Sequence, residues 1–343
     1  MVKTLDLSLS VFSSRIIQST REDVILKASE TRGLWICDEN TRNLLPLPEE
    51  SILALKPGEE QKTWDNVDRI LSRCVEMELD RDSVIFGLGG GVVCDMAAFA
   101  ASIYKRGCGL TLVPTTLLCM VDAGIGGKTG IDYGGYKNLV GTFYPASSIL
   151  IVPQFLGSLP RKELLNGIVE TIKHGIIGSP ELLTFMEANR DRILSGDSEI
   201  TEKLIWLSLR VKSSLVEEDL YEKGRRAWLN LGHTFGHALE AHEGIGKISH
   251  GEAVAWGLER ALTFGTMLGI TGTGVRERIL HLLSSYGCLP RFGVDAEDLI
   301  SGMKQDKKKS RGAVRIIIPV REGEVTVRDY STEELIPLFK KLG

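Results

Sequence analysis

Short apolar runs alternate with amphipathic helical patterns through the first half of the chain. The apolar runs are GLWIC (33–37), SVIFGLGGG (83–91), LTLVPTTLL (110–118) and SILIV (148–152). Between them, WDNVDRILSRCVEMEL (64–79) and CDMAAFAASIYKRG (94–107) predict helices. Strands that alternate with helices are typical of an open parallel α/β sheet. We therefore expect an N-terminal α/β domain, residues 1–152.

The second half of the chain has a different pattern. Pro153 and Leu159-Pro160 mark the junction, and from Arg161 onward long helical stretches are separated by polar turns. The exception is AVRIIIPVREGEVTVRDY (313–330), which predicts a hairpin that returns to a sheet. We expect a mainly α-helical second domain, residues 153–343.

Composition narrows the class of protein. A chain of 343 residues is long enough for two domains with their own cores. Its net charge of -4 indicates no general attraction to nucleic acid or to a membrane, and no uncharged run is long enough to span a bilayer. The six cysteines are scattered without CxxC pairs, which favours buried free thiols. We expect a soluble cytoplasmic protein with neither nucleic-acid nor membrane partners.

Four of the six histidines lie in the segment WLNLGHTFGHALEAHEGIGKISHGE (228–252). His233 and His237 are four apart in a predicted helix, so their imidazoles share one face. His250 stands near the start of the next helical run and can turn back toward His233. Glu170, in RKELLNGIVETIKHGII (161–177), is the third candidate ligand. Two imidazoles and one carboxylate are typical of a catalytic zinc site with an open position. The alternative is that these histidines cap and pack helices.

A glycine-rich turn in the first half is the second candidate site. Gly87-Leu88-Gly89-Gly90-Gly91 follows a predicted strand and precedes a helix that begins near Val92. Such a turn lets backbone N–H groups and a helix N-terminus approach a pyrophosphate, although it also occurs for tight packing alone. The spacing is not GxGxxG and no P-loop follows, which argues against an ordinary dinucleotide dehydrogenase and against a nucleotide hydrolase.

A third cluster joins glycines with cations. Asp122, the segment GGKTG (126–130) and Lys137-Asn138 place two lysines and an amide on what we expect to be glycine-rich loops, where they can bind an anion such as phosphate. The alternative is that both lysines are solvated loop charges. Three further cations, Lys173, Lys212 and Arg226, precede the histidine segment. The run Asp306-Lys307-Lys308-Lys309 by itself indicates a solvated turn.

Together these motifs resemble the 3-dehydroquinate synthases of the sugar phosphate cyclase superfamily. The resemblance rests on eight segments in the order of that family: PGEEQK (57–62), GGGVVCD (89–95), VPTTLL (113–118), VDAGIGGKTGID (121–132), KNLVGTFY (137–144), VETIKHG (169–175), NLGHTFGHALEA (230–241) and HGEAVA (250–255). It implies a Rossmann-like parallel-sheet NAD-binding domain followed by a mainly α-helical metal- and substrate-binding domain. It also implies conversion of 3-deoxy-D-arabino-heptulosonate 7-phosphate, a sugar phosphate, into 3-dehydroquinate and phosphate in the shikimate pathway of aromatic amino acid biosynthesis.

The resemblance carries roles onto individual residues. The metal ligands, for zinc or alternatively cobalt, fall on Glu170, His233 and His250. The NAD contacts fall on Asp38, Glu59, Lys62, Gly90, Gly91, Val92, Asp95, Thr115, Thr116, Asp122 and Lys137, with Lys128 beside them. The substrate phosphate contacts fall on Lys128, Asn138, Asn230, His237 and the run around Lys307, with Arg106 from a neighbouring subunit, so that a homodimer is expected. The substrate carboxylate contacts fall on Lys212 and Arg226, and a hydroxyl contact falls on Lys173. His174 and His242 match no position of the family pattern.

The chain departs from the family pattern at a few places, including Cys94, Ala123-Gly124, Gly157 and Leu220-Tyr221. These departures leave open a sister cyclase, either a 2-deoxy-scyllo-inosose synthase or an amino-dehydroquinate synthase. Lys212 and Arg226 argue against the inosose enzyme, whose substrate has no carboxylate. A metal-dependent polyol dehydrogenase is a further alternative, and it predicts net formation of NADH. A metal-dependent binding protein is the last, and it leaves the glycine-rich turn unexplained.

Overall fold

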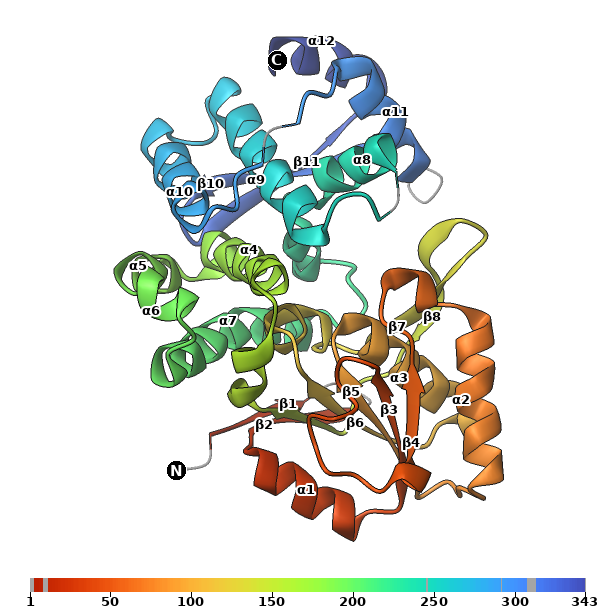
Figure 1. Cartoon of the computed structure of the whole chain (residues 1–343). Helices are drawn as coiled ribbons and strands as arrows, with labels where there is room; N and C mark the ends of the chain where they lie inside the picture. Colours follow the sequence, from red (N-terminus) through yellow and green to blue (C-terminus); the bar gives the residue numbers. More distant parts are fainter. Residues whose placement is uncertain (1–2, 9–11, 245, 291, 307–312, 343) are drawn as a thin grey trace. The chain divides into compact units, whose positions relative to one another are not determined.

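The structure is a computed structural model of the chain (Figure 1), and it describes residues 3–8, 12–244, 246–290, 292–306 and 313–342. The chain forms two compact units: residues 1–164 with 213–221, called unit 1, and residues 165–212 with 222–343, called unit 2. In the part of the chain that the structure describes, no helix is both long and apolar enough to span a bilayer. The domain boundary after residue 152 stays a prediction.

Unit 1 is built on a seven-stranded sheet in the order β1-β2-β9-β6-β5-β3-β4. All neighbours in it are parallel except β1 and β2, which are antiparallel. The strands are β1 (Thr4–Ser8), β2 (Ser13–Gln18), β3 (Gly33–Asp38), β4 (Ile52–Leu55), β5 (Val84–Gly89), β6 (Gly109–Pro114) and β9 (Ser148–Ile151). The predicted parallel α/β sheet is confirmed, and the two strands before residue 20 and β4 are additional to the prediction.

The central strands are buried on both faces, as parallel strands usually are. In β3, β5 and β6 nearly every residue is buried, and the rings of Trp35 and Phe86 stack across β3 and β5 with centroids 4.1 Å apart. The helices of unit 1 are α1 (Arg21–Glu30), α2 (Trp64–Glu76) and α3 (Gly91–Ile103). Helices α2 and α3 pack against each other and against the sheet. Continuous apolar runs such as SVIF therefore predicted buried strands correctly.

The strand order changes direction at β3. From β3 the chain adds β4 on one side and then β5 on the other, so the crevice at the carboxyl ends of β3 and β5 is a topological switch point. Ligands of open α/β sheets bind at such points. Asp38 ends β3, and Gly89 ends β5 one residue before the N-cap of α3, Gly90. The glycine-rich turn singled out in the sequence therefore lies where this fold binds ligands.

Residues 128–143 form a hairpin, and the expectation that Lys128, Lys137 and Asn138 lie on glycine-rich loops is wrong. Strand β7 (Lys128–Tyr133) pairs with the antiparallel β8 (Tyr136–Phe143). Gly134 and Gly135, at φ 59° and 81°, make the two-residue turn. A Gly-Gly pair with positive φ is a strong hairpin signal, because such turns match the twist of the two strands. The sequence interpretation considered the glycines of 126–130 and did not use the Gly134-Gly135 pair, so it missed this turn.

Unit 2 is mainly helical, as predicted (Figure 1). Two long helices, α4 and α7, each have part of their length in it. The helices are α4 (Arg161–Gly178), α5 (Pro180–Ala188), α6 (Arg190–Leu194), α7 (Ser198–Glu218), α8 (His233–Glu243), α9 (His250–Met267), α10 (Thr273–Tyr286), α11 (Ala296–Asp306) and α12 (Thr332–Leu342). Phe235, Phe264 and Phe339 form an aromatic cluster that joins α8, α9 and α12.

The predicted C-terminal hairpin is present, but among the described residues it does not join another sheet. Strands β10 (Val314–Arg321) and β11 (Glu324–Tyr330) pair only with each other. The hairpin packs on helices instead: β10 contacts α9, and the Gly323 N–H in the turn donates to the Ile176 carbonyl at 2.9 Å. The alternating pattern predicted the strands correctly, and it could not show that a helix covers them.

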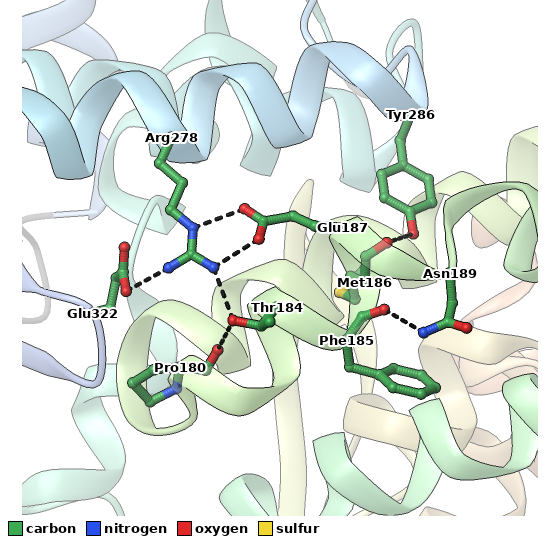
Figure 2. Close-up of polar contacts among 9 residues, drawn as sticks. All are labelled: Pro180, Thr184, Phe185, Met186, Glu187, Asn189, Arg278, Tyr286 and Glu322. Carbon is green, nitrogen blue, oxygen red and sulfur yellow. Dashed lines mark hydrogen bonds and ion pairs between the residues drawn. The ribbon is translucent and has the colours of Figure 1, made fainter.

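A partly exposed polar network joins α5, α10 and the hairpin (Figure 2). The Arg278 guanidinium donates two hydrogen bonds of 2.7 Å to the Glu187 carboxylate and one of 2.6 Å to Glu322. Its third partner is the Thr184 hydroxyl at 3.0 Å, and the Tyr286 hydroxyl donates to the Met186 carbonyl nearby at 2.9 Å. The bidentate arginine–carboxylate pair fixes α10 against α5, and the single contact with Glu322 connects the hairpin to both helices.

Candidate active site

Unit 2 brings the three candidate metal ligands together. The ligand atoms of Glu170, His233 and His250 all lie within 4.8 Å of one another. His250 Nε2 is 3.1 Å and His233 Nε2 is 3.9 Å from Glu170 Oε1. Ligand atoms bound tetrahedrally to zinc at about 2.0–2.2 Å are separated by about 3.3–3.6 Å. The two observed distances bracket that separation, so the donor set fits a divalent metal after small side-chain movements.

A capping box fixes the first residue of helix α9. The Ser249 hydroxyl accepts from the Glu252 N–H at 3.3 Å, and the Glu252 carboxylate accepts from the Ser249 N–H at 2.8 Å. This reciprocal pair fixes the start of the helix and makes His250 its first residue. The Gly251 N–H then donates to Asn166 Oδ1 on α4 at 3.1 Å. Because Asn166 lies one turn before Glu170, this contact brings His250 to the carboxylate.

Glycines let α8 approach α9 closely enough for His233 to reach the same point. A Cβ on Gly257 would lie 2.0 Å from the Gly232 carbonyl oxygen, and a Cβ on Gly236 would lie 2.9 Å from the Ala253 carbonyl oxygen. Gly232 also has φ 82°, a left-handed conformation that favours glycine, and it is the N-cap of α8. His233 is therefore the first residue of a helix held almost against α9.

The Glu170 carboxylate is fully buried and surrounded by nitrogen donors. Its exposed fraction is 0%, and Lys173, one turn later on α4, forms an ion pair with Oε2. Burial opposes a positive charge on His250, but the hydrogen bond and the charge of Glu170 outweigh it and raise the pKa of the imidazole. A buried carboxylate needs positive charge in its surroundings; Lys173 supplies one such charge, and a divalent cation held by Glu170 and the two imidazoles would supply more.

Other predicted substrate residues of unit 2 are distributed around α7 and α8. The His237 ring lies 5.5 Å from that of His233, centroid to centroid, on the same face of α8. Lys212 on α7 and Arg226 in the 3-10 turn Arg225–Asn230 are both buried cations. The Asn230 side chain donates to the Glu222 carboxylate. Lys307 lies outside the described residues.

In unit 1, many of the candidate cofactor residues stand at the carboxyl ends of neighbouring strands. Asp38 at the end of β3 accepts from the Asn40 and Thr41 N–H groups at 3.0 and 2.9 Å. Gly90, Gly91 and Val92 open α3, and Thr115 and Thr116 follow β6. A Cβ on Gly90 would lie 3.1 Å from Thr116 Cγ2, so the two turns approach closely. The helix N-terminus and these turns form a cradle for an anionic ligand.

A polar network centred on the buried Lys62 lies beside this cradle. Lys62 is 3% exposed, and its Nζ donates to Asp95 Oδ2 on α3 at 2.7 Å and to the Asn138 side chain. Glu59 lies 3.8 Å from the same Nζ, and the Asn138 N–H donates to Asp132 Oδ1 at 2.8 Å. Burial lowers the pKa of Lys62, but Asp95 and Glu59 raise it above its ordinary value, so the ammonium stays charged. Four predicted ligand residues are thus held by one another.

The remaining predicted residues of unit 1 come from the hairpin and from two turns. Lys128 is exposed at the start of β7, Lys137 is on β8, and Asp122 is in the π-helical turn Cys119–Ala123. Arg106 and Lys105 adopt left-handed conformations, with φ 65° and 49°. Two consecutive non-glycine residues in this region store backbone strain, which is found most often at functional sites.

The structure adds two residues that sequence reasoning missed. Asn166 holds the start of α9 next to Glu170, and Asp132 fixes the backbone of Asn138, which has φ 51° at an irregularity in the β7–β8 register. Such an irregularity re-aims side chains. Neither residue carries a sequence signal of its own, because an isolated asparagine or aspartate is a common surface or turn residue.

Comparison with known proteins decides the family. The 3-dehydroquinate synthase N-terminal family matches residues 52–166, and the 3-dehydroquinate synthase C-terminal family matches residues 167–309. A 3-dehydroquinate synthase of Symbiobacterium thermophilum is 44% identical over 274 residues, which are 79% of this chain and 76% of that protein. The chain belongs to the 3-dehydroquinate synthase family.

Solved structures of two cyclases have the same fold as this member of the 3-dehydroquinate synthase family. A 2-epi-5-epi-valiolone synthase of Streptomyces hygroscopicus, solved with NAD+ and Zn2+, matches with TM-score 0.84 and 22% identity, covering 96% of each chain. A 2-deoxy-scyllo-inosose synthase complexed with carbaglucose-6-phosphate, NAD+ and Co2+ matches with TM-score 0.86 and 23% identity, covering 99% of each chain. At this identity the likeness shows the fold: a parallel-sheet part followed by a helical part, as predicted.

Proposed function

We propose that this chain is a 3-dehydroquinate synthase that converts 3-deoxy-D-arabino-heptulosonate 7-phosphate into 3-dehydroquinate and phosphate. The observation that carries the proposal is the cluster of Glu170, His233 and His250 in a chain of this family. Identity of 44% to a named 3-dehydroquinate synthase, against 22–23% to the two sister cyclases, supports this activity over theirs.

Two cofactors belong to the proposal. Glu170, His233 and His250 would hold a divalent metal, zinc or cobalt, and the strand ends of unit 1 with Gly90, Gly91 and Val92 would hold NAD. These groups supply a Lewis acid for the substrate hydroxyl and a reversible hydride acceptor. The valiolone and inosose synthase structures carry NAD+ with Zn2+ and with Co2+, respectively, which supports the pairing.

The side chains of the chain then hold and orient the substrate. We assign Lys212 and Arg226 to the carboxylate, and their burial favours this assignment, because a charge-assisted hydrogen bond is stronger away from water. We assign Lys128, Asn138, Asn230 and His237 to the phosphate, and Lys173 to a hydroxyl. Elimination and ring closure need one substrate conformation, and charged contacts at both ends of the substrate provide it.

The carboxylate contacts distinguish this proposal from its alternatives. A carboxylate-free hexose phosphate gives no reason for two buried cations, Lys212 and Arg226. A polyol dehydrogenase gives no reason for them either, and it leaves NADH in solution. Amino-dehydroquinate synthase differs at a ring heteroatom of its substrate and keeps both charged ends, so a direct comparison of substrates separates it.

The experiment incubates purified protein with heptulosonate phosphate, NAD and zinc, and follows phosphate release and NADH absorbance together. We expect phosphate release that requires NAD, with no steady accumulation of NADH, because the hydride returns to the product. A parallel incubation with the amino analogue of the substrate should be much slower. Stoichiometric NADH would support the dehydrogenase, and faster turnover of the amino analogue would support the sister cyclase.

Three further expectations remain proposals. The cytoplasm is the proposed location, since all six cysteines are buried free thiols, as in proteins of reducing compartments. A homodimer is proposed from the role given to Arg106. The division into an NAD-binding domain at residues 1–152 and a metal- and substrate-binding domain at residues 153–343 is the third.

A further inference from the structure

Two buried polar side chains in unit 2 are not used by the assignments above. His174 on α4 and Ser208 on α7 both have an exposed fraction of 0%, and His174 Nδ1 lies 2.7 Å from Ser208 Oγ. Burying an imidazole and a hydroxyl costs free energy unless they are hydrogen-bonded. The short contact satisfies the hydroxyl and the Nδ1 atom of the ring, and it fixes the ring orientation, because the hydrogen bond ties that nitrogen to α7.

His174 is oriented next to a proposed metal ligand. It follows Glu170 by four residues on α4, so both side chains lie on one face of the helix. A ring nitrogen of His174 lies within 4.8 Å of a Glu170 carboxylate oxygen. Lys173 and His250 contact the same carboxylate directly, so several neighbours on α4 and α9 surround it.

We propose that Ser208 and His174 are a positioning pair for Glu170: the Ser208 hydroxyl fixes the His174 ring, and the ring holds the Glu170 carboxylate in the orientation that binds metal. The proposal rests on the metal site assigned above. Neither residue contacts the reacting atoms, so both are positioning residues. Partners that orient a metal ligand in this way change metal affinity by about 10- to 100-fold when they are removed.

The helix α7 offers a matched control. Thr201 lies two turns before Ser208, is also buried, and its hydroxyl makes no hydrogen bond among the described residues. Thr201→Val and Ser208→Ala therefore each remove one buried hydroxyl from the same helix. Only Ser208→Ala removes the contact with His174.

The experiment measures zinc affinity of metal-stripped protein by competition with a chromophoric chelator, and the visible absorption spectrum of the cobalt-loaded protein. For Ser208→Ala and His174→Gln we expect about 10- to 100-fold weaker zinc binding and a changed cobalt spectrum. Thr201→Val should match the wild type in both. Thermal unfolding of the metal-stripped variants shows separately whether each variant folds. If His174→Gln does not fold, the zinc affinity and cobalt spectrum of Ser208→Ala test the proposal.

Wild-type zinc affinity and an unchanged cobalt spectrum in Ser208→Ala would refute the proposal that Ser208 and His174 position Glu170. Equal losses in Thr201→Val and Ser208→Ala would also overturn it, because they would show a general effect of α7 packing. The proposed function fails differently: wild-type protein with zinc and NAD would then release no phosphate from heptulosonate phosphate, whatever the zinc affinities of the variants.

Discussion

His250 Nε2 lies 3.1 Å from Glu170 Oε1, although the two residues are 80 positions apart in the chain. The contact depends on a backbone approach rather than on long side chains. Gly251 N–H reaches Asn166 Oδ1 at 3.1 Å, and a Cβ on Gly251 would lie 2.5 Å from that oxygen and 2.7 Å from Asn166 Cα. The absence of a side chain at one position therefore sets the distance between α4 and α9.

Gly251→Ala should push α9 away from α4. We expect a loss of about 1–3 kcal/mol in the free energy of unfolding from the steric overlap, together with weaker zinc binding. Gly274→Ala is the matched control, because Gly274 is also the second residue of a helix and a Cβ there meets nothing within 4 Å. It should be neutral or stabilise by up to about 1 kcal/mol. Urea unfolding and chelator competition measure both quantities, and equal behaviour of the two variants would refute the argument.

Arg226→Ala should lower kcat/KM by about 30- to 1000-fold, or about 2–4 kcal/mol, because a buried charge-assisted contact with the carboxylate is lost. Arg226→Lys should recover part of the loss, since an ammonium cannot reproduce a bidentate fork. Arg225→Ala is the control: Arg225 is exposed and lies over the Trp228 ring, 4.5 Å from its centroid.

A substrate analogue without the carboxylate separates the two ends of the substrate. Its turnover should be nearly insensitive to Arg226→Ala and still sensitive to Lys128→Ala. Wild-type kcat/KM in Arg226→Ala with heptulosonate phosphate would remove the carboxylate assignment and would favour a cyclase that acts on a carboxylate-free sugar phosphate.

Lys62→Met should destabilise unit 1 by about 3–5 kcal/mol, because it leaves the Asp95 carboxylate without its buried cation. The double variant Lys62→Met with Asp95→Leu should regain much of this loss. Arg73→Met breaks an exposed pair with Glu76 on α2 and should cost less than about 1 kcal/mol. Denaturant unfolding measures all three. A loss in Lys62→Met no larger than that in Arg73→Met would show that the pair contributes no more than a surface contact.

The cysteine thiols should be unreactive in the folded protein. Burial raises the pKa of Cys37 and of Cys74 to about 12. Because the thiol pKa is raised, these side chains are protonated at about pH 8. The thiolate is the reactive form, so the protonated thiols react slowly. A thiol reagent should label almost none of the six cysteines before denaturation and all six afterwards. Rapid labelling of Cys37 or Cys74 in native protein would contradict the burial.

The fold was predictable from the sequence wherever a hydrophobic pattern was compatible with only one kind of element. The apolar runs at β3, β5, β6 and β9 and the helical patterns of α2 and α3 correspond to observed elements, because buried parallel strands and amphipathic helices leave clear periodicities. The β7–β8 hairpin was missed, since the turn signal of Gly134-Gly135 was not considered and Lys128, Lys137 and Asn138 were attributed to ligand loops. The sequence also could not show that β10–β11 packs on helices rather than joining the sheet.

The candidate metal site was predictable from histidine spacing, and the residues that assemble it were not. His233 and His250 stand at the starts of two helices, and a capping box at Ser249 and Glu252 can be recognised in the sequence. The close approach of α8 to α9 depends on Gly232, Gly236 and Gly257, and glycines inside helical segments carry no indication of their partners. Ser208 gave no signal, because a single serine in a helix is common.

The metal content of purified protein tests the central claim most directly. Glu170, His233 and His250 are proposed to hold the metal, so wild-type protein should bind one equivalent of zinc, and removal of that zinc should abolish phosphate release until zinc or cobalt is restored. His250→Ala should lose most of the bound zinc, because two remaining ligands make a poor site. Full zinc occupancy together with wild-type phosphate release in His250→Ala would contradict the account.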